Sequence, residues 1–340
     1  TAGDSIIAGG NYNTLVGDQA GTAVTTGDNN TAFGWGAARA LTTGNGNVAV
    51  GYNSLGADTL GDRAVAIGLS ALSSQNFITT TDNYNVAVGY YAGLNVTTGI
   101  QNTLIGGLAG DALTDADYNV AVGVQALSTD TLGSKSVAIG RSALSSQNFT
   151  SATDAHNVAV GYGAGNDVTT GTDNTFIGGL AGDANTTASN NTAVGYNSLG
   201  ANITGANNTA VGKSALAANL SGIQNVAVGN NALDANTASN NTAVGDDSLG
   251  ANTTGTFNVA LGAAALNVNI SSDSATAVGY AALTSSTGAK NTGLGRAAGA
   301  SVTTGSNLTL VGYNSQPSSA TAINEVTLGD TNVATFRCQV

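Results

Sequence analysis

The chain has 340 residues, of which 48 are glycine, one is proline, one is cysteine and only 8% are charged. An average globular domain is about 25% charged, so this composition argues against an ordinary compact domain. A hydrophobic content of 41% argues equally against a disordered chain. The formal net charge is −12 and the eight Lys and Arg residues are scattered, which excludes the basic surface that nucleic-acid binding requires. No apolar run is long enough to suggest membrane insertion.

One short motif, Asn-Thr-Ala-Val-Gly and its variants, recurs along the whole chain. We call its glycine the anchor and number the other positions of each repeat relative to it. Position −1 is always Val, Ile, Leu or Phe, position −3 is always Thr or Val, position −4 is Asn in fourteen copies, and position +3 is Ala or Ser in eighteen. The anchor number increases by 17 at each step, except by 16 at Gly245 and Gly295 and by 21 at Gly89 and Gly161. The nineteen anchors are Gly17, Gly34, Gly51, Gly68, Gly89, Gly106, Gly123, Gly140, Gly161, Gly178, Gly195, Gly212, Gly229, Gly245, Gly262, Gly279, Gly295, Gly312 and Gly329.

The residues before each anchor predict a short β-strand, because β-branched side chains at −3 and −1 alternate with a small one at −2. The anchor itself is predicted to need a positive φ or a close backbone neighbour. The segment after it, such as residues 196–199, is predicted to be a weaker strand, and the Thr-Thr-Gly stretches are predicted turns. The structural anchors that we single out are Gly51, Gly89, Gly123, Gly161, Gly195, Gly212, Gly229 and Gly262.

Two strands and two turns in each repeat predict one coil of an all-β parallel solenoid, with equivalent positions stacked about 4.8 Å apart. The asparagines at −4, such as Asn191, Asn208 and Asn225, are predicted to hydrogen-bond along their column, although asparagine is also simply a good turn residue. Each coil has few large apolar side chains to offset its ordering entropy, which favours burial against other chains. Small residues at −2 and +3 would let chains approach closely. We therefore predict a homo-oligomer, most plausibly a homotrimer.

A larger duplication covers part of the chain, since the segment 71–77 reappears at 143–149. Each block carries a four-residue insertion, around residues 76–82 and 148–154, and insertions in a solenoid become loops on one face. Phe77 and Phe149 fall in these loops. They either fold back over the coil or contact a ligand at the loop tip, and we include them among the candidate receptor contacts.

Tyrosine recurs at position +1 and forms the second set of candidate receptor contacts. An aromatic ring with a polar tip suits stacking on a sugar, but the same rings can instead close the edge of each coil. These residues are Tyr52, Tyr90, Tyr162, Tyr196, Tyr280 and Tyr313.

Enzyme chemistry has little support in the sequence, and we predict no catalytic residue, no metal ligand and no cofactor. His156 is the only histidine, and Cys338 has no second thiol or nearby histidine to form a metal site or a nucleophile pair. Asp246 and Asp247 lack the calcium-binding nonapeptide repeat around them.

The repeat pattern decays after Gly312, where Pro317 and a degenerate copy at residues 325–329 follow. We therefore predict two parts: residues 1–312 as the repeat region of about eighteen coils, and residues 313–340 as a last degenerate repeat and a junction to a further C-terminal domain. Because the chain starts at Thr1, we expect it to be a processed or truncated piece of a longer protein.

The repeat at residues 191–205 resembles the repeats of bacteriophage tail-fibre proteins. The Val-Ala-Ile-Gly motifs at residues 65–68 and 137–140 are similar to those of trimeric autotransporter adhesin heads, and this resemblance implies an elongated, left-handed, homotrimeric parallel β-roll. Residues 326–340 resemble the segment that precedes an endosialidase-type intramolecular chaperone, which this chain lacks through self-cleavage or truncation.

The resemblance implies a structural fibre of a phage virion, joined to other tail or baseplate proteins, that attaches to a glycan or protein receptor on a bacterial host. One alternative is the head of a trimeric adhesin on the bacterial cell surface. A second alternative is a scaffold filament without a ligand.

Overall fold

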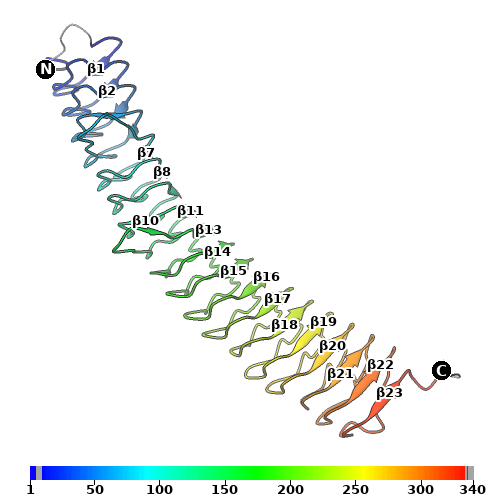
Figure 1. The fold of residues 1–340 in the computed structure, drawn as a ribbon. Helices are drawn as coiled ribbons and strands as arrows, with labels where there is room; N and C mark the ends of the chain where they lie inside the picture. The colour runs from blue at the N-terminus through cyan, green and yellow to red at the C-terminus, as the bar shows by residue number, and fades with distance from the viewer. Residues whose placement is uncertain (5–9, 334, 336–340) are drawn as a thin grey trace, which may run out of the picture. The chain divides into compact units, whose positions relative to one another are not determined.

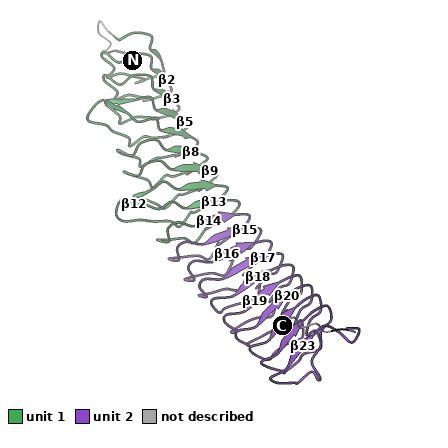
Figure 2. Cartoon of the chain, turned by 45° about the vertical axis from the view of Figure 1, so that its right-hand side comes forward, with its two compact units in different colours: residues 1–174 green, residues 175–340 purple. Residues whose placement is uncertain are grey.

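The computed structural model describes residues 1–4, 10–333 and 335, so Cys338 and most of the predicted C-terminal strand lie outside the described residues. The chain divides into two compact units, residues 1–174 and residues 175–340, coloured green and purple in Figure 2. The described residues form strands and turns without a helix. The all-β parallel solenoid of about 19 turns with a repeat of about 17 residues is therefore confirmed.

The first unit holds a parallel ladder of nine three-residue strands, one per coil, which lie side by side in Figure 1. Two further pairs of two-residue strands, β4 with β6 and β10 with β12, join the insertions to the coils that precede them. The ladder strands are β1 (Thr14–Val16), β2 (Thr31–Phe33), β3 (Val48–Val50), β5 (Val65–Ile67), β7 (Val86–Val88), β8 (Thr103–Ile105), β9 (Val120–Val122), β11 (Val137–Ile139) and β13 (Val158–Val160). The short strands are β4 (Gly61–Asp62), β6 (Thr81–Asp82), β10 (Gly133–Ser134) and β12 (Thr153–Asp154).

The second unit holds a parallel ladder of ten such strands, which continues past residue 312 to β23. Its strands are β14 (Thr175–Ile177), β15 (Thr192–Val194), β16 (Thr209–Val211), β17 (Val226–Val228), β18 (Thr242–Val244), β19 (Val259–Leu261), β20 (Thr276–Val278), β21 (Thr292–Leu294), β22 (Thr309–Val311) and β23 (Val326–Leu328).

The register follows the repeat without a slip, because each residue pairs with the same position of the next coil. Between β15 and β16, for example, Thr192 pairs with Thr209, Ala193 with Ala210 and Val194 with Val211. The stacking of like on like that the repeat predicts is confirmed in both units.

The anchor glycines have the predicted conformation. Gly212 has a φ of +136°, and a Cβ placed on it would lie 2.3 Å from the carbonyl oxygen of Gly229, the anchor of the next coil. No L side chain fits there, because both the dihedral angle and the space are forbidden. The eight anchors singled out from the sequence all share a positive φ.

The interior of each coil is lined by position −2 and not by the β-branched positions. Ala193, Ala210 and Ala227 are fully buried, and position +3 is buried beside them, as Ala215 shows. The prediction that small residues at −2 and +3 let neighbouring chains approach is therefore wrong, because they face the inside of their own coil. Each coil has a single interior, and it takes the side chain at −2, which is Ala in most coils but Phe176 in one. The alternation along the strand leaves positions −3 and −1 outside.

The segment after the anchor is a turn, and the prediction of a weak strand there is wrong. In residues 196–199, Asn197 and Leu199 have φ values of 55° and 51°, in the left-handed region that interrupts a strand. A left-handed non-glycine residue costs roughly 1–2 kcal/mol. The Leu199 side chain is fully buried, which returns a similar or larger amount.

The buried side chains at positions +4, +7 and −2 vary together from coil to coil. Where +4 is Leu199, position +7 is the buried amide Asn202, whereas Gly165 at +4 goes with the buried Val168. In another coil Gly182 stands at +4 because Phe176 fills the space, and a Cβ on Gly182 would lie 2.5 Å from that ring. Close packing of a thin interior explains why these residues vary together.

Candidate functional site

The asparagine column is an interior hydrogen-bond ladder. Asn208 is 1% exposed, its backbone N–H donates to Asn191 Oδ1 at 2.9 Å, and its Nδ2 donates to the carbonyl of Gly222 at 2.8 Å. Its Oδ1 in turn accepts from the backbone N–H of Asn225 at 3.0 Å. The predicted ladder is confirmed, and because these amides face the interior, the column contributes stability and not a binding surface.

The insertion in the first block is held by a buried carboxylate. Asp58 is fully buried and accepts hydrogen bonds from the backbone N–H groups of Gly61 and Phe77 at 3.1 Å and from Gln75 Nε2 at 2.6 Å. Burial raises the pKa of Asp58, and these hydrogen bonds oppose the rise. The insertion is thereby fastened to the coil beneath it.

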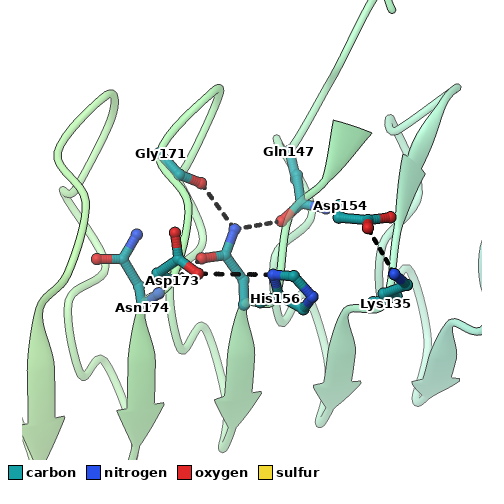
Figure 3. Close-up of polar contacts among 8 residues, drawn as sticks. Lys135, Gln147, Asp154, His156, Gly171, Asp173 and Asn174 are labelled. Carbon is teal, nitrogen blue, oxygen red and sulfur yellow. Dashed lines mark hydrogen bonds and ion pairs between the residues drawn. The ribbon is translucent and has the colours of Figure 1, made fainter. Parts of the chain in front are cut away.

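The same arrangement recurs in the second block. Gln147 Nε2 donates to Asp130 at 2.6 Å, and Gln147 Oε1 accepts from Asn157 at 2.8 Å, which also donates to the carbonyl of Gly171 at 2.7 Å. Figure 3 shows the contacts that join Gln147 and Gly171. The duplication therefore preserved an interior polar network together with its loop.

Phe77 and Phe149 point inward, with exposed fractions of 5% and 6%. The ring of Phe77 covers the coil at Gly61, where a Cβ would lie 2.9 Å from it. Of the two alternatives from the sequence, folding back over the coil is the observed one, and a receptor contact through these buried rings is excluded in this conformation. The large hydrophobic residue that the first loop exposes is Ile78, whose exposed fraction is 81%.

The tyrosines of position +1 lie on the surface of their units, with exposed fractions between 52% for Tyr52 and 59% for Tyr313. Tyr52 stacks on Trp35 with ring centroids 4.7 Å apart. The Arg296 guanidinium lies 5.8 Å from the ring centroid of Tyr280 and 5.5 Å from that of Tyr313. Such rows of rings are compatible with stacking on a sugar and with closing the edge of each coil. Their contact with a receptor stays a prediction.

The remaining positions of this column are Tyr90, Tyr162 and Tyr196, all of them exposed. Tyr90 stacks on Tyr91, and Arg141 lies over the Tyr162 ring.

A second exposed column at position −5 was not found from the sequence. Its residues have a positive φ, as in Tyr84 and Tyr118. Arg63 forms an ion pair with Asp82, and the equivalent Lys135 lies 2.5 Å from Asp154. Figure 3 also shows His156 of this column 3.6 Å from Asp173. Position −5 is polar, aromatic or charged in every repeat except at Gly46, and this regularity was the available signal.

A polar hollow of about 350 Å³ opens at this column in the first unit. Its lining consists of Asn29, Asn45, Gly46, Asp62 and Arg63. The hollow lies where Gly46 replaces the side chain that other coils carry at position −5.

The outward side chains of positions −1 and −3 form what we call the outer strand face. Ile177, Leu261 and Leu294 are 40%, 38% and 47% exposed, and Val226 at position −3 is 37% exposed. All nineteen residues at −1 are aliphatic or Phe, all nineteen at −3 are Thr or Val, and none carries a charge. Each unit thus presents an uncharged, largely aliphatic strip one strand wide.

Two kinds of site were not found among residues 1–4, 10–333 and 335. No cluster of three or more His, Cys, Asp or Glu side chains there is arranged to hold a metal ion. No helix there has the length and hydrophobicity of a membrane span. No protein-family model matches this chain, and no curated protein matches its sequence.

Proposed function

We propose that this chain is a non-enzymatic structural subunit of a homotrimeric, left-handed β-solenoid fibre that attaches a phage virion to a bacterial host surface. The observation that carries the proposal is the outer strand face. A strip three residues long and nine or ten coils deep covers about 450 Å² in each unit, from the dimensions of parallel strands. The largest apolar patch of a typical monomer is about 300–600 Å² and is often functional, so a strip of this size in each unit is a candidate interface.

Sister copies of the chain are the partners that this face fits best. The strip of about 450 Å² in each unit is a little more than half of the roughly 800 Å² that each partner contributes to a stable interface. The net charge of −12 opposes association elsewhere, whereas the outer strand face brings no like charges together. A closed threefold arrangement covers the strip on every subunit without leaving an open end, as closed symmetry requires.

Attachment is the second element of the proposal and is supported by the exposed rings at positions +1 and −5, which suit a glycan or protein receptor. Other tail or baseplate proteins would hold the fibre on the virion. The head of a bacterial surface adhesin is the alternative that the Val-Ala-Ile-Gly motifs favour, and it uses the same trimeric face.

If the chain forms a homotrimer, sedimentation velocity should give a mass three times the 33.0 kDa of one chain. The double variant Val244→Glu and Leu261→Glu places two carboxylates on the outer strand face, where both side chains are 38% exposed in the single chain. We expect it to sediment as a monomer or to precipitate, because burying unpaired carboxylates at an interface is costly.

The matched control is Thr254→Glu, which adds a carboxylate at an exposed turn outside that face and should leave the mass unchanged. A wild-type chain that sediments as a monomer over the micromolar range contradicts the assembly.

Attachment is tested separately by adding fluorescently labelled protein to panels of bacterial cells. Saturable binding to some strains supports a receptor-binding fibre. An assembled trimer that binds no strain in a broad panel would instead support the scaffold filament.

A further inference from the structure

The polar hollow around Gly46 is built from side chains that are held in place. Asp62, which is 8% exposed, accepts hydrogen bonds from the backbone N–H of Asn45 at 2.6 Å and from its Nδ2 at 3.3 Å. Arg63 donates to the hydroxyl of Tyr84 at 3.1 Å, pairs with Asp82, and lies 5.5 Å from the Tyr84 ring centroid. Fixed polar groups bind a ligand at a smaller entropic cost than mobile ones.

The duplicated block carries a side chain where the hollow has none. Tyr118 is the counterpart of Gly46 in the next block and has the same left-handed backbone, with a φ of 60° against 66°. The backbone N–H of Gly46 donates to the backbone carbonyl of Asp28 at 3.0 Å, and that of Tyr118 donates to the carbonyl of the equivalent Ile100 at 3.0 Å. The two positions therefore share one backbone conformation, which accepts a tyrosine at position −5.

The lining chemistry indicates an uncharged ligand rich in hydroxyl groups. Asp62 offers acceptors, Arg63 offers donors, and the carboxamide of Asn29 offers both. The Asn45 carboxamide is held within the protein, because its Oδ1 accepts from the Asp28 N–H at 2.9 Å and its Nδ2 donates to the Thr43 carbonyl at 3.1 Å. An anionic ligand would meet the carboxylates of Asp62 and Asp82, and a cationic one would meet the Arg63 guanidinium. The volume of about 350 Å³ lies at the lower end of the range for small-ligand sites, which suits one or two sugar units.

We propose that the hollow formed by Asn29, Asn45, Gly46, Asp62 and Arg63 is a binding site for a neutral saccharide unit. This inference rests on the proposed function, because it identifies the glycan class that the fibre contacts at the host surface.

The test compares wild-type protein with Gly46→Tyr on an array of neutral oligosaccharides of glucose, galactose, mannose, rhamnose and N-acetylglucosamine. Sialylated and sulfated glycans are printed beside them. A Cβ on Gly46 meets only Arg63 Cγ, at 3.8 Å, and the equivalent Tyr118 has the same left-handed backbone, so we expect the variant to fold. Its melting temperature should be slightly lower than that of wild type, because a non-glycine residue is strained at a φ of 66°. Binding of at least one neutral oligosaccharide should fall at least tenfold.

Two further variants control the result. Thr254→Tyr adds the same ring at an exposed turn of the other unit, outside positions +1 and −5, and it should bind as wild type does. Arg63→Gln removes the guanidinium but leaves the hollow open, and it should also weaken binding.

Neutral-saccharide binding that Gly46→Tyr leaves unchanged overturns the proposal, as does binding to acidic glycans alone or to no glycan on the array. Cell binding separates this failure from that of the proposed function. If wild type and Gly46→Tyr attach equally to a host strain, the attachment function stands and the site is rejected; if wild type attaches to none, the attachment function itself fails.

Discussion

Gly212→Ala is expected to lower the free energy of unfolding by about 3–5 kcal/mol. Single substitutions cause a loss this large only when they strain the backbone or disrupt the core. The new Cβ would lie 2.3 Å from the Gly229 carbonyl oxygen, and the φ of +136° is forbidden to alanine. The atom that it meets is backbone and not the end of a flexible side chain. The coil can relieve the clash only by separating from its neighbour, and this breaks hydrogen bonds between the two coils.

The measurement is thermal and urea unfolding followed by circular dichroism, with Gly250→Ala as the matched control. Gly250 lies in the same unit outside the left-handed region, and its Cβ would make an ordinary contact at 3.4 Å with the Asp247 carbonyl oxygen. That change should be neutral or stabilise by up to about 1 kcal/mol. Equal melting of the two variants would mean that anchors need no glycine.

Asn208→Ala is expected to cost about 1–3 kcal/mol, because the buried Asn225 N–H loses its acceptor. The Gly222 carbonyl also loses the hydrogen bond from Asn208 Nδ2 but keeps the one from Asn219 Nδ2 at 3.0 Å. At Ala64, one of two alanines that the chain carries in this column, the N–H of Asn85 finds another acceptor in Asn83 Oδ1 at 2.9 Å. Such a replacement acceptor is not present beside Asn225 among the described contacts.

The same unfolding measurements check this variant against Asn230→Ala. Asn230 is exposed and donates to Asp246 at 3.1 Å on the surface, so its loss should change stability by less than about 0.5 kcal/mol. If Asn208→Ala is as mild as this control, solvent reaches the ladder and the column is not a closed interior.

The period of the fold was predictable because the backbone imposes it at every coil. An anchor such as Gly212 must be glycine, and an amide such as Asn208 must repeat for its ladder to continue. Both constraints act on residue identity at a fixed spacing, so the spacing is visible in one sequence. Register follows directly, since like residues can stack only when neighbouring coils are offset by one whole repeat.

The faces of the strand were harder to predict because alternation alone does not say which side is inside. Val211 and Ala210 alternate, and the rule that larger apolar residues are buried favours Val211, yet the interior of the coil takes Ala210. The interior position of Phe77 likewise depends on Gly61, a contact that the insertion creates and that no period reveals.

The hollow at Gly46 was missed because a binding site in a repeat is a local departure from the pattern. A search for the repeat looks for residues that the coils share at position −5. The hollow instead exists at the coil in which Gly46 has no side chain at that position. Comparison of the duplicated blocks, with Gly46 against Tyr118, was the signal in the sequence that could have indicated it.

Positions +4 and +7 carry matched pairs of residues, Leu199 with Asn202 in one coil and Gly165 with Val168 in another. This pairing has an evolutionary consequence. A crossover within one repeat that joins an incompatible pair leaves a void or a collision, whereas a crossover at an anchor transfers a matched set. Lineages of such proteins should therefore lengthen and shorten by whole repeats, with their recombination junctions clustered at the anchor glycines.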